Sequence, residues 1–182
     1  MATKQSKSTT NPKMSDESSA LKDFFIDSLK DLYWAEKNLV KAIPRMAKKA
    51  TSDELRSALE SHLAETENQV IKLEQVFASI DEKATAKKCE AMEGLIKEAE
   101  SIMSETEDGT MTRDVGIIAA AQKVEHYEIA SYGTIRTLAD VLGLPEASEL
   151  LNQILEEEKN ADSLLTQIAE GFVNQSALKE EK

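Results

Sequence analysis

The chain has 182 residues, of which 31% are charged, and 34 acidic against 22 basic side chains give it a formal net charge of −12. This length corresponds to one ordinary domain, and the 41% of hydrophobic residues is enough to fill a core. The acidic balance, with a pI near 4.7, excludes broad electrostatic binding to nucleic acid or to an anionic membrane surface, since both need a basic face.

The hydrophobic residues form no stretch that is long enough to cross a bilayer. The longest uninterrupted apolar run is Ile117–Ala121, whereas a membrane span needs roughly 18 residues or more. The first twenty residues are polar and lack the apolar segment of a secretory signal. A single cysteine, Cys89, fits a reducing compartment. We therefore expect a soluble, cytoplasmic protein with no membrane and no nucleic-acid partner.

The first half of the chain reads as two long amphipathic helices. Glycine and proline are scarce, and apolar residues recur every three to four positions. The first helix runs from about residue 19 to Ala50, with Pro44 late in its pattern. Thr51 and Glu54 have the spacing of a capping box, which predicts that a second helix begins there and ends near Ile80.

The second half of the chain predicts three further helices. A shorter one covers roughly residues 86–104. Thr112 is the expected N-cap of a fourth helix, which Gly143 closes. Pro145 suits the first turn of a fifth helix, because its missing N–H would be unpaired there in any case.

These elements predict an all-α protein with a four-helix bundle about 40 Å long, at a rise of 1.5 Å per residue. An additional short helix lies in the connection between the second and third bundle helices. We expect residues 1–18 to be a flexible polar tail, residues 19–172 to form the helical domain, and residues 173–182 to be a frayed tail.

Polar side chains interrupt each long apolar stripe near its middle. Pairs three or four residues apart share one face of a helix. In an antiparallel bundle of equal helices the midpoints lie at one height, so these side chains are expected to converge. The set consists of Glu36, His62, Glu65, Glu125, Glu128, Glu158 and Asp162.

Burying several ionised carboxylates together costs many kcal/mol unless protons or cations compensate. A pair of divalent metal ions is a natural compensation, because carboxylates with an imidazole suit iron or manganese, and bridging carboxylates hold two ions roughly 3.5–4 Å apart. Two alternatives stay open. The acids are salt-bridged or protonated in the core, or the helix phase places them in solvent.

Two neighbours of these residues have less direct interpretations. His126 lies about 100° round the helix from Glu125, which favours a place behind the ligands or at an interface. Tyr132, one turn from Glu128, hydrogen-bonds a ligand, serves as a redox-active tyrosine, or is a core aromatic residue with its hydroxyl at the edge.

Five segments closely resemble the bacterial YciE/YciF ferritin-like stress proteins, and the likeness covers about residues 21–170. The segments are DLYWAEKNL, HLAETENQVIKLEQVF, CEAMEGLIKEAE, AAQKVEHYEIASYGT and LEEEKNADSLLTQIA. The resemblance implies a ferritin-like four-helix bundle with a fifth short helix, a dinuclear metal centre in its middle, and a homodimer.

Matched residue by residue, the resemblance assigns one ligand or pair to each long helix: Glu36, then Glu65, then Glu125 with Glu128, then Glu158 with Asp162. The chain departs from most ferritin-like di-iron proteins, which carry Glu-x-x-His twice. The position three before His62 is Leu59, and the position three before His126 is Lys123. If His62 is a ligand, it precedes its glutamate.

The expected function is that of a dinuclear protein with two transition-metal ions per chain, iron in preference to manganese, that reacts with peroxide or dioxygen during stress. Glu65 and Glu158 are the bridging candidates. Whether the protein is an oxidoreductase of the peroxidase, catalase or oxidase type stays open. The alternatives are an iron-sequestering protein with the same bundle and a non-catalytic dimeric interaction protein.

Overall fold

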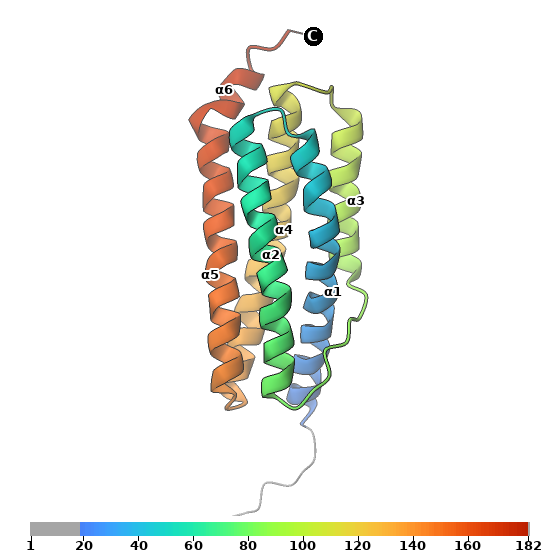
Figure 1. Ribbon diagram of the computed structural model, residues 1–182, viewed down its shortest axis with the longest axis vertical. Coiled ribbons are helices and arrows are strands. Elements are labelled where there is room, and N and C mark those ends of the chain that lie inside the picture. Colours follow the sequence, from blue (N-terminus) through green and yellow to red (C-terminus); the bar gives the residue numbers. More distant parts are fainter. Residues whose placement is uncertain (1–18, 182) are drawn as a thin grey trace, which may run out of the picture.

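The computed structural model describes residues 19–181, and every regular element in that range is a helix. Figure 1 shows an elongated molecule whose long helices run side by side. The expected tail over residues 1–18 lies outside the described residues. The helices are α1 (Ala20–Lys49), α2 (Asp53–Ser79), α3 (Glu90–Glu105), α4 (Met111–Val141), α5 (Pro145–Ile168), a π-helical turn (Ala169–Val173) and α6 (Asn174–Ala177).

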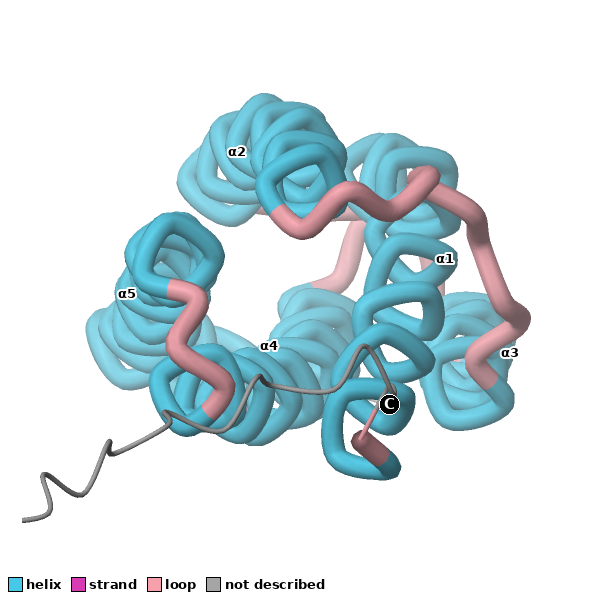
Figure 2. Tube along the Cα trace, turned by 90° about the horizontal axis from the view of Figure 1, so that it is seen from below, coloured by secondary structure: helices cyan, strands magenta, loops and turns pink. Residues whose placement is uncertain are grey.

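The four long helices pack in the cyclic order α1, α2, α5, α4, which we call the helix ring (Figure 2). The short α3 lies outside the ring against α1 and α4. The segment between α2 and α3 returns along α1, where the backbone N–H of Lys87 donates to the carbonyl of Lys30 over 3.0 Å. This arrangement covers α4 on its outer side, whereas the outer sides of α2 and α5 face solvent.

Two helices begin at a different residue from the one that the sequence predicts. Ser52, and not Thr51, caps α2, because its hydroxyl accepts a backbone N–H of the first turn. The Thr51 hydroxyl instead donates to the carbonyl of Thr110 over 2.9 Å. Thr110 in turn caps α4, so Thr112 lies inside that helix. Each correction moves the cap by one or two residues.

The short helix α3 begins later than expected, at Glu90, because Cys89 is its N-cap. The Cys89 sulfur accepts the backbone N–H of Met92 at 3.3 Å and also contacts the hydroxyl of Tyr127 at 3.1 Å. The cysteine is buried, and burial raises the pKa of its thiol above the ordinary value. Cys89 therefore has a structural role at the start of α3.

Helical structure continues into the segment after residue 172, where the sequence predicts a frayed tail. Gly143 has a φ of 70° after α4, and Pro145 is the first residue of α5, as predicted. The helix then continues through the π-helical turn, where Val173 is fully buried. The carboxylate of Glu180 accepts the backbone N–H of Met111 at 2.5 Å. Burial of one side chain and this contact with α4 hold residues that the sequence leaves free.

The core consists of two apolar clusters inside the helix ring, one toward each end of the long helices. One contains Leu39 and Leu59, and the other contains Phe25 and Leu73. Buried ionisable side chains separate the two clusters on α2, α4 and α5, and one more lies where the clusters meet on α1. We call these the polar layer. Its members are Glu36, His62, Glu125, Glu128 and Glu158.

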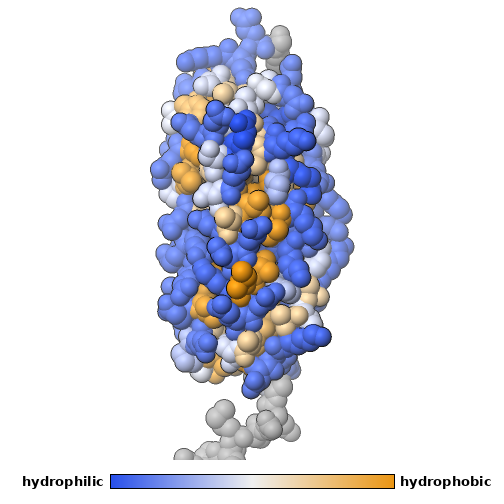
Figure 3. All heavy atoms as spheres, viewed as in Figure 1, coloured by the Kyte–Doolittle hydropathy of each residue, from blue (hydrophilic) through white to orange (hydrophobic). Residues whose placement is uncertain are grey.

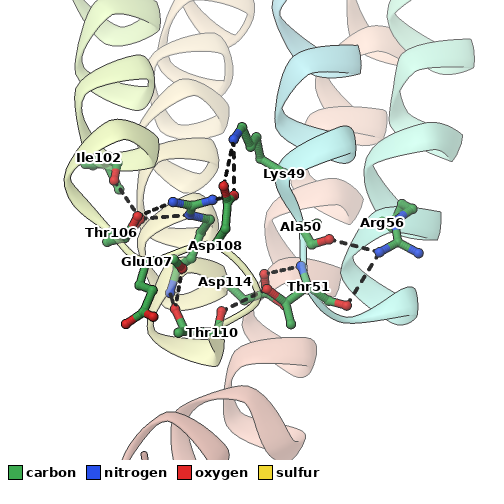
Figure 4. Close-up of polar contacts among 11 residues, drawn as sticks. Lys49, Ala50, Thr51, Arg56, Ile102, Thr106, Glu107, Asp108, Thr110 and Asp114 are labelled. Atoms are coloured by element: carbon green, nitrogen blue, oxygen red, sulfur yellow. Dashed lines mark hydrogen bonds and ion pairs between the residues drawn. The ribbon is translucent and has the colours of Figure 1, made fainter. Parts of the chain in front are cut away.

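A buried carboxylate ties the α1–α2 turn to α4 (Figure 4). Asp114 is fully buried, and its two oxygens accept the backbone N–H groups of Thr51 at 2.7 Å and Ser52 at 2.8 Å. Beside it, the buried guanidinium of Arg113 contacts Asp108 at the turn between α3 and α4. These contacts fix the height of α2 relative to α4, and therefore the height of the α2 and α4 members of the polar layer.

The surface is mostly polar on the face that Figure 3 shows, with hydrophobic side chains scattered between charged ones. Within residues 19–181, we find no helix with the length and apolar character that crossing a membrane requires.

Candidate metal centre

All four long helices contribute to the polar layer. Helix α1 supplies Glu36, α2 supplies His62, α4 supplies Glu125 and Glu128, and α5 supplies Glu158. The four glutamates are at most 2% exposed, and the histidine is 8% exposed. Four carboxyl groups and one imidazole are therefore withdrawn from solvent between two apolar clusters.

Three members of the polar layer approach within the reach of one ion. The Nε2 atom of His62 lies 3.4 Å from Oε1 of Glu125. One potential ligand atom from each of His62, Glu125 and Glu158 lies within 4.8 Å of the others. On the other side of the layer, the hydroxyl of the fully buried Tyr132 donates to Oε1 of Glu36. The tyrosine thereby holds one oxygen of Glu36 in place.

Several carboxylate oxygens of the layer have no hydrogen-bond partner among the described residues. These are one oxygen each of Glu36, Glu125 and Glu128 and both oxygens of Glu158. A buried polar atom without a partner costs about 1–3 kcal/mol, and more when it is charged. Native proteins rarely leave so many such atoms together. The layer therefore needs compensation from protons or from cations.

Burial determines the protonation of the layer. It raises the pKa of Glu36 to about 8, with the nearby charge of Glu158 as the second cause. Burial likewise raises the pKa of Glu125 to about 8 and holds those of Glu128 and Glu158 well above their ordinary range. In the absence of cations, these groups retain protons at neutral pH. Divalent cations can replace those protons, and the donor set of carboxylate oxygens and one imidazole fits iron or manganese.

The structure does not bring Glu65 into the polar layer. Its side chain is 47% exposed, and its Oε2 lies 3.6 Å from Nδ1 of His62. The neighbouring imidazole lowers the pKa of Glu65. Burial lowers the pKa of His62, but the surrounding carboxylates, first Glu65 and then Glu158, outweigh that effect and raise it. Glu65 is thus an ionised group on the solvent side of the histidine.

Asp162 and His126 form a separate pair between α4 and α5. Nε2 of His126 lies 3.3 Å from Oδ1 of Asp162, with side chains 69% and 23% exposed. The amide of Gln122 also donates to Oδ1 of Asp162 at 3.1 Å. The structure therefore places Asp162 outside the polar layer. Its partner there is His126, which the sequence analysis puts behind the ligands or at an interface.

A cavity of about 100 Å³ leads from the surface between α2 and α5 to the layer. Its inner end is lined by His62 and Glu125. Its outer part is lined by Ala58, Ser61, Glu65, Asn160, Ala161 and Leu164. Apart from Glu65, the sequence analysis misses these outer residues. These residues are small or lie at the edge of a helix face. They therefore do not interrupt the apolar stripes from which the sequence analysis identifies candidate residues.

These observations define an all-helical protein with a buried carboxylate and histidine layer that fits a metal centre. Residues 20–178 match the family described as "Domain of unknown function (DUF892)", and the chain belongs to this family. Protein YciF of Escherichia coli strain K12 is 47% identical over 158 residues, which cover 86% of this chain and 95% of that protein. The resemblance to the YciE/YciF proteins is confirmed.

Solved structures agree with this family relationship. The crystal structure of the E. coli stress protein YciF is 46% identical and covers 86% of this chain and 98% of its own, with a TM-score of 0.82. The YcfI protein of Rhodopseudomonas palustris is 40% identical, covers 84% and 97%, and has a TM-score of 0.79. A protein of Xanthomonas campestris, 21% identical with coverage of 87% and 97% and a TM-score of 0.68, shares the fold.

Proposed function

We propose that the chain is a ferritin-like four-helix-bundle protein whose polar layer holds two transition-metal ions, iron in preference to manganese. We further propose that it reacts with peroxide or dioxygen during stress. The observation that carries the metal centre is the set of buried carboxylate oxygens without partners, both oxygens of Glu158 among them. The stress role is supported by the similarity to YciF, which is described as a stress protein.

The polar layer divides naturally between two ions. His62, Glu125 and Glu158 would hold the first, since their ligand atoms lie close together. Glu36 and Glu128 would hold the second, and Glu158, whose two oxygens both lack a hydrogen-bond partner, would be available to both ions. Glu65 and Asp162, expected as ligands from the sequence, are left outside this set.

Two iron ions, when bound, supply one-electron and dioxygen chemistry that amino-acid side chains lack. The protein's own residues prepare the place for that chemistry. The carboxylates of the layer balance the positive charge, and Tyr132 orients Glu36 through its hydroxyl. The two apolar clusters keep bulk water from either end, and the cavity between α2 and α5 admits a molecule as small as peroxide or dioxygen.

The test is metal analysis combined with an optical assay. We expect the wild-type chain to bind at least about one transition-metal ion, and Fe(II)-loaded protein to develop an absorption change with peroxide or dioxygen faster than free Fe(II) does. The double variant with Glu125→Gln and Glu158→Gln is the control without a centre. A wild-type chain that neither contains metal nor binds added Fe(II) would overturn the proposal.

We also propose that the protein forms a homodimer. Gel filtration tests this directly, because a dimer elutes at about twice the chain mass of 20.1 kDa. A much larger closed assembly would favour iron storage instead.

A further inference from the structure

One opening between the helices connects solvent with the polar layer. The cavity between α2 and α5 has Glu125 and His62 at its inner end and the half-exposed Glu65 at its outer end. Four further cavities of the described residues have no member of the polar layer in their lining. On the opposite side of the ring, α3 covers α1 and α4 (Figure 2).

His62 stands between an outer and an inner carboxylate. Its Nδ1 faces Oε2 of Glu65 at 3.6 Å, and its Nε2 faces Oε1 of Glu125 at 3.4 Å. Nδ1 is buried and has no hydrogen-bond partner, since 3.6 Å is too long for one. A cation that moves inward along the cavity therefore meets an ionised carboxylate, then an imidazole, then a buried carboxylate.

The outer part of the cavity suits a hydrated divalent cation. Glu65 offers a charged carboxylate, and the Ser61 hydroxyl and Asn160 amide add neutral oxygen atoms beside it. Ala58 and Ala161 leave the passage open through their small side chains. A negative group at the mouth of a low-dielectric passage raises the local concentration of cations, and hence the rate at which they bind.

We propose that this cavity is the path by which divalent cations reach the polar layer and that Glu65 is the residue that first captures them. The proposal rests on the proposed metal centre and adds its access route. Glu65 changes the rate of metal binding and leaves the final occupancy unaltered, because it lies outside the group of residues that would hold the ions.

A different role for Glu65 is to orient His62 through Nδ1, as carboxylates behind metal-ligating histidines do. Glu65→Gln separates the two roles. The glutamine oxygen still accepts from an imidazole N–H, so orientation is retained, while the negative charge is lost. Glu67→Gln, on the exposed side of the same helix, removes an equal charge away from the cavity and is the matched control.

The experiment is stopped-flow binding of Co(II) to the metal-free protein, followed by its visible absorption, with the bound metal counted at the end. We expect Glu65→Gln to slow binding by about fivefold or more at low ionic strength, with the difference shrinking in high salt and the bound metal unchanged. Ala161→Leu, which narrows the cavity, should also slow binding. Leu164→Ala, at the exposed mouth, should not, and Glu67→Gln should bind at the wild-type rate.

Four results would overturn the proposal. An unchanged rate in Glu65→Gln removes Glu65 from the path, and a lower final amount of bound Co(II) in that variant makes it a permanent ligand. An unchanged rate in folded Ala161→Leu assigns the path to another opening. A wild-type chain that binds no Co(II) overturns the metal centre itself, and so separates the failure of the proposed function from that of the access route.

Discussion

Replacing Glu36 with glutamine isolates the effect of one buried charge in the polar layer. Glu36 is fully buried, and Tyr132 donates a hydrogen bond to its Oε1. Glutamine has nearly the same shape and keeps an oxygen that can accept this bond. The variant therefore removes the ionisation of the side chain while largely preserving its packing.

The magnitude follows from the pKa. Burial, helped by Glu158, raises the pKa of Glu36 from 4.5 to about 8. At Glu36 the folded protein therefore holds a proton that the unfolded chain releases, so the stability associated with this group is greatest below pH 4.5 and is lost as the pH rises toward 8. At about 1.4 kcal/mol per pKa unit, the upper limit of the loss is about 5 kcal/mol in the metal-free protein.

The assay is urea unfolding in the presence of a chelator at pH 5 and pH 8. We expect Glu36→Gln to be more stable than the wild type by a few kcal/mol at pH 8, with a much smaller difference at pH 5. Adding Fe(II) or Mn(II) should stabilise the wild type more than the variant. A variant that is less stable than the wild type at pH 8, or a difference that does not depend on pH, would refute the reasoning.

Two further predictions concern the contacts of α4, one with the turn between α1 and α2 and the other with α3. Asp114→Ala removes the acceptors of the Thr51 and Ser52 backbone N–H groups, so we expect urea unfolding to show a loss of about 2–4 kcal/mol. A loss below about 1 kcal/mol would contradict that role. Gly116→Ala brings a Cβ to 2.5 Å from Cγ2 of Ile102, and we expect thermal and urea unfolding to show a loss of about 1–3 kcal/mol. Gly116→Ala should cost less in an Ile102→Ala background than in the wild type, and an equal cost in both backgrounds would place the strain elsewhere.

Much of the helical architecture is predictable because the apolar stripes are long and glycine and proline are rare. The residues at which the helices begin and end are harder to predict from the sequence. Thr51 and Ser52 are both good caps, and the choice between them depends on Asp114, which is distant in sequence and binds both backbone N–H groups. The contacts of the last residues likewise depend on distant partners, since Glu180 accepts backbone N–H groups at the start of α4.

The members of the polar layer differ in how well the sequence indicates their place. Glu36 and Glu158 interrupt otherwise apolar stripes, and both are fully buried. A second acid three or four residues away lies on the same broad face of a helix, but its burial depends on what covers the flank. On α4, Glu125 and Glu128 both lie on the side that faces the interior of the ring, where Glu125 approaches His62, so both are buried.

On α2 and α5 the second acid lies on the flank of the helix, so two acids that the sequence places in the layer lie outside it. Glu65 reaches the solvent side of His62, and Asp162 pairs with His126 between α4 and α5. Sequence periodicity gives the broad face of a helix but not its rotation relative to its neighbours, so it cannot distinguish a packed flank from one that faces solvent. The distinction becomes visible only once the helices are packed.

The most direct test of a metal centre in the polar layer is anomalous X-ray diffraction from crystals of the protein loaded with Fe(II) or Mn(II). We expect a strong anomalous peak in contact with His62, Glu125 and Glu158 and a second one beside Glu36 and Glu128. Peaks confined to exposed acids, with none in the polar layer of a protein shown to carry metal, would contradict this placement.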